Sequence, residues 1–171
     1  NRLIEDLVTF YRLTEKQMSM GEVPMNDLVQ TVTQEQLRMQ QISKNVQLKI
    51  EPLPAAYGDF YLLRLLFSHL IGNALKFSKQ EEQPQLEIQG TTKPGETVYV
   101  IRDNGIGFDM QYANKLFQVF QKLQKNDEFE GNGIGLAAAK KIVEKHGGQI
   151  SIDSKPGNGT AVTVSLPVKA A

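Results

Sequence analysis

The sequence predicts an α/β domain in which helices alternate with strands, and three stretches carry this prediction. Residues 60–77 form a strongly apolar stretch, long enough for a core helix. Thr97–Ile101 is a nearly continuous apolar run, which is typical of a central strand. Residues 149–153 and 159–166 flank the turn signal Pro156-Gly157-Asn158, so we expect a closing hairpin there.

The amino-acid composition narrows the classes of function that the chain could have. With 171 residues, 40% of them hydrophobic and 22% charged, the chain suits one core-bearing globular domain with an appendage. The 19 basic and 19 acidic residues balance, so no global field favours nucleic acid as a partner. There is no Cys and hence no thiolate site, and no apolar run reaches the roughly 20 residues of a membrane span. Because the chain begins at Asn1 within a helical pattern, we expect it to be a fragment of a longer protein.

The first helix is expected over residues 1–20, ended by Gly21 and Pro24. Its apolar residues form two adjacent rows, namely Leu3, Leu7 and Phe10, and Ile4, Val8 and Tyr11. This broad stripe belongs either to a core helix of this domain or to one half of a helical hairpin whose partner lies outside the chain. On the second interpretation we expect self-association or exposed apolar surface.

The next elements are a helix from Asn26, as its N-cap, to Asn45, and an alternating strand over 46–50. Asp59 is expected to cap the apolar helix 60–77. Two strands, 85–90 and 96–102, follow around the turn signal at 93–95. A short helix over 110–117 precedes a polar stretch, 118–131, that we interpret as a mobile lid. The last helix, 134–146, stops at Gly147-Gly148, and His146 at its end is interpreted as a favourable end charge.

The apolar helix 60–77 carries one polar stripe. His69, Asn73 and Lys76 are spaced four and three residues apart and therefore share one face. The side-chain carbonyl of Asn73 could bind Mg²⁺, which prefers oxygen ligands and keeps several waters. Lys76 could neutralise a phosphate. The alternative is a solvated stripe on a surface helix.

Three further motifs follow. Asp103, within Asp103–Gly107, ends the expected central strand, where its carboxylate could accept hydrogen bonds from a ligand amine; an Asx turn is the alternative. Phe117 and Phe120 lie three apart and could anchor the lid, although such pairs are more often core. Residues 130–136 place three glycines at alternate positions before a helix, an arrangement that suits either a phosphate cradle or tight packing.

In order and spacing, these four motifs resemble the asparagine box, first glycine box, phenylalanine box and second glycine box of sensor histidine kinases. That family belongs to the superfamily of gyrase, heat-shock chaperone and mismatch-repair ATPases. The resemblance covers about residues 25–167, and the phytochrome-like branch is the most similar. It implies a two-layer sandwich of the Bergerat type, with about five strands in a mixed sheet backed by about three helices and preceded by one extended helix. Residues 1–23 would be the end of the second dimerisation-hairpin helix, and residues 24–171 the catalytic ATP-binding domain.

The resemblance also implies site roles. Asp103 would receive the adenine amino group, Asn73 would bind Mg²⁺, and Lys76 and Lys122 would hold phosphates. Phe117 and Phe120 would seat the lid, and His69 would belong to the catalytic set. The residues at which the backbone would line the nucleotide are Gly105, Gly107, Gly131, Gly133, Ile134, Gly135 and Leu136. The implied partners are ATP, a phosphoacceptor His on a dimerisation hairpin, a response-regulator receiver domain and a second copy of the full-length protein, and the implied location of the domain is cytoplasmic.

The chain departs from the family pattern at three points. His69 stands where Asn is usual, as in chemotaxis-type kinases. Lys122 replaces a common Arg and loses the bidentate grip of a guanidinium on phosphate. The only two histidines are His69 and His146, so the phosphoacceptor is absent from this chain.

These departures keep two other functions open. The first is a nucleotide-sensing scaffold that has lost catalysis. The second is an ATPase of the gyrase or chaperone kind, which is disfavoured because those enzymes place a Glu where His69 stands.

Overall fold

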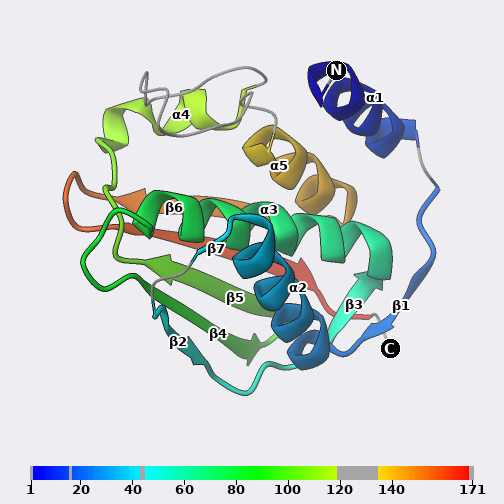
Figure 1. Ribbon diagram of the computed structural model, residues 1–171. Helices are drawn as coiled ribbons and strands as arrows, with labels where there is room; N and C mark the ends of the chain where they lie inside the picture. Colours follow the sequence, from blue (N-terminus) through cyan, green and yellow to red (C-terminus); the bar gives the residue numbers. More distant parts are fainter. Residues whose placement is uncertain (1, 16, 43–44, 119–134, 170–171) are drawn as a thin grey trace.

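The computed structural model describes residues 2–15, 17–42, 45–118 and 135–169 (Figure 1). Its helices are α1 (Arg2–Glu15), α2 (Met25–Met39), α3 (Phe60–Ser78), the 3-10 helix η1 (Met110–Tyr112), α4 (Ala113–Leu116) and α5 (Gly135–Lys145). Its strands are β1 (Met20–Val23), β2 (Gln47–Ile50), β3 (Ala56–Asp59), β4 (Gln85–Lys93), β5 (Glu96–Asp103), β6 (Gln149–Ser154) and β7 (Thr160–Pro167).

The main sheet has five strands in the order β2-β4-β5-β7-β6. β2 is parallel to β4 and the other neighbours are antiparallel, so the sheet is mixed. Helices α2, α3 and α5 lie together on one side of this sheet, as Figure 1 shows. This arrangement confirms the predicted two-layer sandwich and the central place of strand β5.

The core lies between α3 and the sheet. Thr97, Tyr99 and Ile101 of β5 are buried at alternate positions, so the helix-facing side of the strand continues to Asp103 at its end. Phe67 of α3 meets Tyr99 edge-to-face, with ring centroids 5.7 Å apart, and both side chains are fully buried. Truncating such an aromatic side chain to Ala costs about 3–5 kcal/mol of folding free energy. This packing fixes α3 over the middle of the sheet.

The segment after α1 differs from the prediction of one helix to Met20. α1 ends at Glu15, and Met20–Val23 forms strand β1, which pairs antiparallel with β3. Val23 is buried in the core, and the backbone N–H of Ser19 donates to the Asp59 carboxylate at 2.9 Å. Backbone pairing with β3, a strand that the sequence did not reveal, therefore outweighs the helical pattern there.

The N-cap prediction for α2 was also wrong. The helix begins at Met25 after Pro24, which occupies the N-cap position. Asn26 lies inside the first turn, and its side-chain oxygen accepts the N–H of Leu53 at 2.8 Å. A Pro just before the first turn suits a helix start because its fixed φ is already close to helical.

Helix α1 exposes apolar side chains to solvent over most of its length. Ile4, Val8 and Tyr11 are exposed, Leu7 is 38% exposed, and Leu13 near the C-terminal end of the helix is buried. The side chain of Leu3 lies outside the described part. The exposed apolar surface that we expected is therefore present, while Phe10 and Leu13 pack on the core of the domain, and the hairpin interpretation stays a prediction. Among the described residues, no helix combines the length and the apolar character that crossing a bilayer demands.

His146 does not act as an end charge. The ring is 93% buried, since its relative exposure is 7%, and its Nε2 accepts the backbone N–H of Asp59 at 3.0 Å. An accepting Nε2 carries no proton, so Nδ1 is the protonated nitrogen and donates to the carbonyl of Ile142 at 2.8 Å. His146 is therefore a neutral bridge that joins the end of α5 to the start of α3.

Candidate functional site

Helix α3 carries the first group of predicted site residues. It begins where the carboxylate of Asp59 accepts the N–H of Leu62 at 2.9 Å, as the sequence predicted. His69, Asn73 and Lys76 are all half-buried on this helix. A Cβ placed on Gly135 would lie 3.2 Å from Nδ1 of His69, so this stripe meets the first residue of α5. The His69 end of this stripe is therefore directed at a neighbouring element, and the site roles of Asn73 and Lys76 stay predictions.

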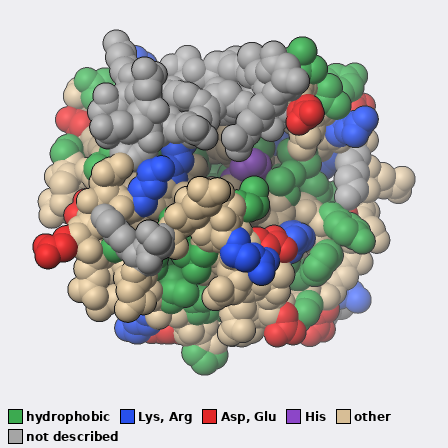
Figure 2. All heavy atoms as spheres, in the orientation of Figure 1, with side chains coloured by type: hydrophobic (Ala, Val, Ile, Leu, Met, Phe, Trp, Pro, Cys, Tyr) green, Lys and Arg blue, Asp and Glu red, His purple; other side chains and the backbone are tan. Residues whose placement is uncertain are grey.

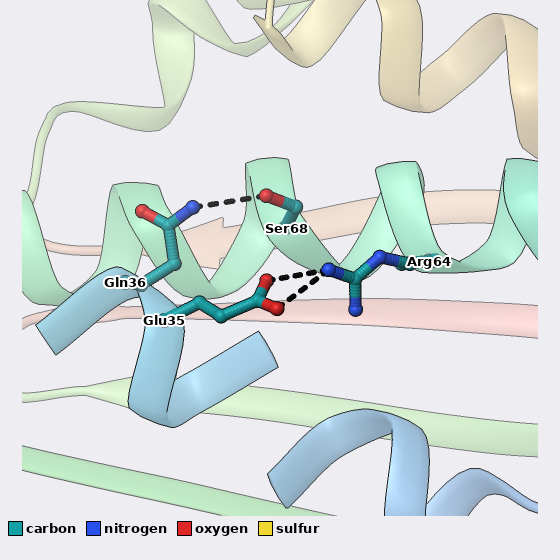
Figure 3. Close-up of polar contacts among 4 residues, drawn as sticks. All are labelled: Glu35, Gln36, Arg64 and Ser68. Atoms are coloured by element: carbon teal, nitrogen blue, oxygen red, sulfur yellow. Dashed lines mark hydrogen bonds and ion pairs between the residues drawn. The ribbon is translucent and has the colours of Figure 1, made fainter. Parts of the chain in front are cut away.

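Helix α2 holds α3 through polar contacts (Figure 3). The Glu35 carboxylate accepts two hydrogen bonds from Arg64, at 2.6 and 2.7 Å. Gln36 donates to Ser68 at 2.9 Å, one residue before His69. Figure 2 shows acidic and basic side chains meeting on this face over α2 and α3.

A second contact lies one turn further along α3. Gln40 donates to the carbonyl of Gly72 at 2.9 Å, one residue before Asn73. A Cβ on Gly72 would approach the side-chain oxygen of Gln36 at 2.8 Å, so the two helices are closely packed here. Together with the Gln36–Ser68 bond, this contact fixes the rotation of α3 about its axis at the two turns that present His69 and Asn73.

The glycine loop after β5 is anchored to the C-terminal end of α3. The N–H of Ile106 donates to the carbonyl of Phe77 at 3.2 Å. A Cβ on Gly105 would collide with that same carbonyl, and Gly107 has φ +64° with its Cβ position blocked by the carbonyl of Lys155. Both glycines are therefore required by close packing within the protein. This anchoring brings Asp103 to the end of α3 that carries Asn73 and Lys76.

The carboxyl of Asp103 has a strongly perturbed pKa. Burial raises its pKa from 3.8 to about 6, and hydrogen bonds from the N–H groups of Gly105 and Thr160 oppose this rise. The bond from Gly105 measures 2.8 Å. A half-buried carboxyl with a raised pKa at the end of a strand, beside a polar helix face, is a candidate binding group for a ligand donor.

The remaining motifs lie partly outside the described residues. Phe117 ends α4, and the Lys140 ammonium of α5 lies 5.8 Å from its ring centroid, so α4 and α5 are adjacent. Leu136, at the start of α5, is half-buried against the core. The predicted site residues Phe120, Lys122, Gly131, Gly133 and Ile134, and the lid that they would form, lie outside the described residues.

A cavity of about 240 Å³ opens at the end of β5, β6 and β7, lined by Asp103, Ser154, Thr160 and neighbouring residues. It also includes the exposed Arg102 and Asp153, which belong to the other face of the sheet, and no residue of α3. We therefore locate the candidate site by the α3 stripe and the Asp103 side chain, and not by this cavity.

Sequence reasoning gave no site role to two residues beside Asp103. Thr160 pairs with Asp103 across β5 and β7, and Ser154 pairs with Thr160 across β6 and β7. Ser154 is 5% exposed. The signal that could have revealed them is the register of the closing hairpin, which sequence alone does not give.

The side chains near the α3 stripe could hold Mg²⁺ through a single protein ligand. Among the residues with described positions, no group of three His, Cys, Asp or Glu side chains could hold a metal ion. Mg²⁺ in nucleotide sites needs only one or two protein ligands, because phosphate oxygens and waters complete its octahedron. The half-buried Asn73 amide fits such a single-ligand role.

Comparisons with known proteins identify the family of this chain. Residues 58–170 match the family of histidine kinase-, DNA gyrase B- and HSP90-like ATPases. Phytochrome-like protein Cph1 of Synechocystis is 31% identical over 97% of this chain, which spans 22% of that protein. Cyanobacterial phytochrome A of Nostoc is 42% identical over 69% of this chain, which spans 15% of that protein.

Solved structures share the fold. The mycobacterial sensor histidine kinase MprB superposes with a TM-score of 0.72 at 23% identity, covering 91% of this chain and all of that one. Full-length ShkA in complex with AMPPNP gives a TM-score of 0.80 at 21% identity, covering 99% of this chain and 36% of that one. The chain belongs to the histidine kinase-, DNA gyrase B- and HSP90-like ATPase family, as a histidine-kinase ATP-binding domain.

Proposed function

We propose that this chain binds Mg-ATP and transfers the γ-phosphoryl group to a His on a dimerisation hairpin. The phosphoryl group would then pass to the receiver domain of a response regulator. The observation that carries the proposal is the anchoring of the Asp103 loop on the end of α3, because it joins a base-binding carboxyl to the helix that bears Asn73 and Lys76. The full-length protein would act as a homodimer with this domain in the cytoplasm.

Each residue has a chemical role in this proposal. Asp103 accepts a hydrogen bond from the 6-amino group of adenine. Lys76 neutralises phosphate charge, and the backbone N–H groups at the start of α5 face the phosphates with the positive end of the helix dipole. The Asn73 amide oxygen would hold Mg²⁺, which neutralises charge on the phosphate oxygens when bound. His69, beside Gly135, lies where the polar stripe reaches α5.

The reaction itself is a displacement at phosphorus. The bond from the γ-phosphorus to the bridging oxygen breaks as a bond to an imidazole nitrogen of the acceptor His forms. ADP leaves with the bridging oxygen, and the imidazole proton passes to solvent. Since such a transfer demands mainly positioning and charge neutralisation, the domain needs no covalent nucleophile of its own.

The test is transfer of label from γ-labelled ATP to the dimerisation hairpin of the same protein, supplied to this chain. We expect acid-labile, base-stable labelling of the hairpin that is lost when its acceptor His is replaced. The Asn73→Ala variant should abolish labelling, whereas Gln111→Ala, an exposed change on η1, should leave it intact. Absence of labelling despite tight nucleotide binding would contradict the kinase proposal.

A nucleotide-sensing scaffold is the second candidate. It is favoured by His69 at a position where Asn is usual, together with the close approach of His69 to Gly135. On this alternative the His69→Asn variant would gain phosphotransfer that the natural sequence lacks. A natural sequence that labels the hairpin at the same rate as the variant excludes the scaffold.

A further inference from the structure

The hydroxyl of Ser154 lies at a junction of three segments. It accepts the N–H of Phe108 from the glycine loop at 3.0 Å and donates to the carbonyl of Gly159 in the β6–β7 turn at 2.8 Å. Its third contact is the hydroxyl of Thr160, also at 2.8 Å. Ser154 is buried, so water does not replace these partners at low cost.

These contacts determine where the hydroxyl proton of Thr160 points. A Ser hydroxyl has one proton and two lone pairs. Because the proton of Ser154 is given to Gly159 and one lone pair receives Phe108, the bond to Thr160 is made with Thr160 as the donor. The hydroxyl proton of Thr160 is thereby directed toward Ser154.

Asp103 lies on the other side of Thr160. The two residues are direct cross-strand partners in β5 and β7, and Ser154 is the direct partner of Thr160 in β6. Side chains of such partners share one face of the sheet, with Cβ atoms about 4.5–5.5 Å apart. A freely rotating Thr160 hydroxyl could therefore donate to the Asp103 carboxylate and occupy an acceptor position that a ligand needs.

We propose that Ser154 is a positioning residue of the nucleotide site, which holds the Thr160 hydroxyl away from Asp103 and so keeps the carboxylate open to the 6-amino group of adenine. This inference rests on the proposed function, in which Asp103 binds adenine. Ser154 itself touches no reacting atom. Its effect is confined to how strongly the site distinguishes a base with a 6-amino group from one without it.

The test compares the affinity for ADP with that for purine riboside diphosphate, which lacks the 6-amino group. In the natural sequence we expect ADP to bind about tenfold or more tightly than the analogue, the range for a hydrogen bond to a charged acceptor. In Ser154→Ala this ratio should fall to about threefold or less. Ser151→Ala, an exposed Ser on the same strand, is the matched control and should keep the natural ratio.

A double variant tests whether the Thr160 hydroxyl is the group that competes for the Asp103 carboxylate. Removing the competing hydroxyl as well, in Ser154→Ala/Thr160→Val, should raise the ratio again above that of Ser154→Ala. A merely structural role for Ser154 would weaken both ligands equally and leave the ratio unchanged. If Ser154→Ala does not fold, Ser154→Cys fills the same space with a weaker hydrogen-bonding group and should show the same reduced ratio.

The outcomes distinguish a failure of the proposed function from a failure of the role assigned to Ser154. A natural sequence that binds neither ligand at millimolar concentration overturns the proposed function and this inference with it. A natural sequence that prefers ADP, with the same preference in Ser154→Ala or Ser154→Cys, overturns the role of Ser154 alone.

Discussion

Replacing Asp103 by Asn should make the protein more stable while weakening its binding of nucleotide. The carboxyl has a pKa of about 6 in the folded chain against its ordinary value of 3.8. Each pKa unit corresponds to about 1.36 kcal/mol, so an ionised Asp103 disfavours the fold by at most about 3 kcal/mol at pH 7. Asn carries no charge and keeps a carbonyl for the N–H of Gly105. Its amide nitrogen is a donor and cannot accept the N–H of Thr160, so one hydrogen bond is lost and we expect a net gain of about 1–2 kcal/mol.

The direction of the pKa shift determines how the stability contribution of Asp103 changes with pH. Because the folded pKa is raised, the favourable contribution of protonated Asp103 is complete below about pH 3.8 and is lost as the pH rises through about 6. The stability difference between Asp103→Asn and the natural sequence should therefore be largest above pH 7. By the same linkage it should be reduced by about half at pH 5.

Urea denaturation at pH 7 and pH 5 measures the stability difference, and calorimetric titration with ADP measures binding. We expect the affinity of Asp103→Asn to fall about tenfold to a hundredfold, since a hydrogen bond to a charged group is worth about 1.5–3 kcal/mol. A variant that is less stable than the natural sequence at pH 7 would refute the conclusion that ionised Asp103 disfavours the fold. An unchanged ADP affinity would refute its role in binding adenine.

Three further predictions concern the framework of the site. Gly107→Ala should lower the free energy of unfolding by about 2 kcal/mol or more in urea denaturation, because of its positive φ and the blocked Cβ position, whereas Gly21→Ala, with open space around it, should change little. His146→Ala should cost about 2–3 kcal/mol by the same measurement, since it leaves the buried N–H of Asp59 without an acceptor; an unchanged stability would contradict the bridging role. In sedimentation equilibrium the natural chain should self-associate through the exposed stripe of α1 and Leu7→Lys should not, and a natural chain that remains monomeric at high concentration would disprove this.

The sequence predicted the elements with a strong period or a clear stop signal. Strand β5 was evident from its apolar run, and α3 from its apolar stretch behind the Asp59 cap. The end of α5 at Gly147 was evident too, and that residue has φ +77°. Each of these depends on local residues that the sequence displays directly.

The missed features depend on contacts between distant residues. β1 exists because it pairs with β3, whose partner residues lie 33 positions (Val23 with Ala56) to 39 positions (Met20 with Asp59) later in the chain. Neither four-residue strand has a period long enough to recognise. His146 was misread because its partner, the N–H of Asp59, lies 87 residues earlier. Ser154 and Thr160 gain their significance only from the register of three strands. Tertiary pairing of this kind leaves no local pattern in the sequence.

Calorimetric titration of the chain with ADP or a non-hydrolysable ATP analogue, with and without Mg²⁺, tests the central claim most directly. We expect binding in the micromolar-to-millimolar range that strengthens when Mg²⁺ is present and loses that gain in Asn73→Ala. Absence of binding at millimolar nucleotide would contradict the nucleotide site formed by α3 and Asp103.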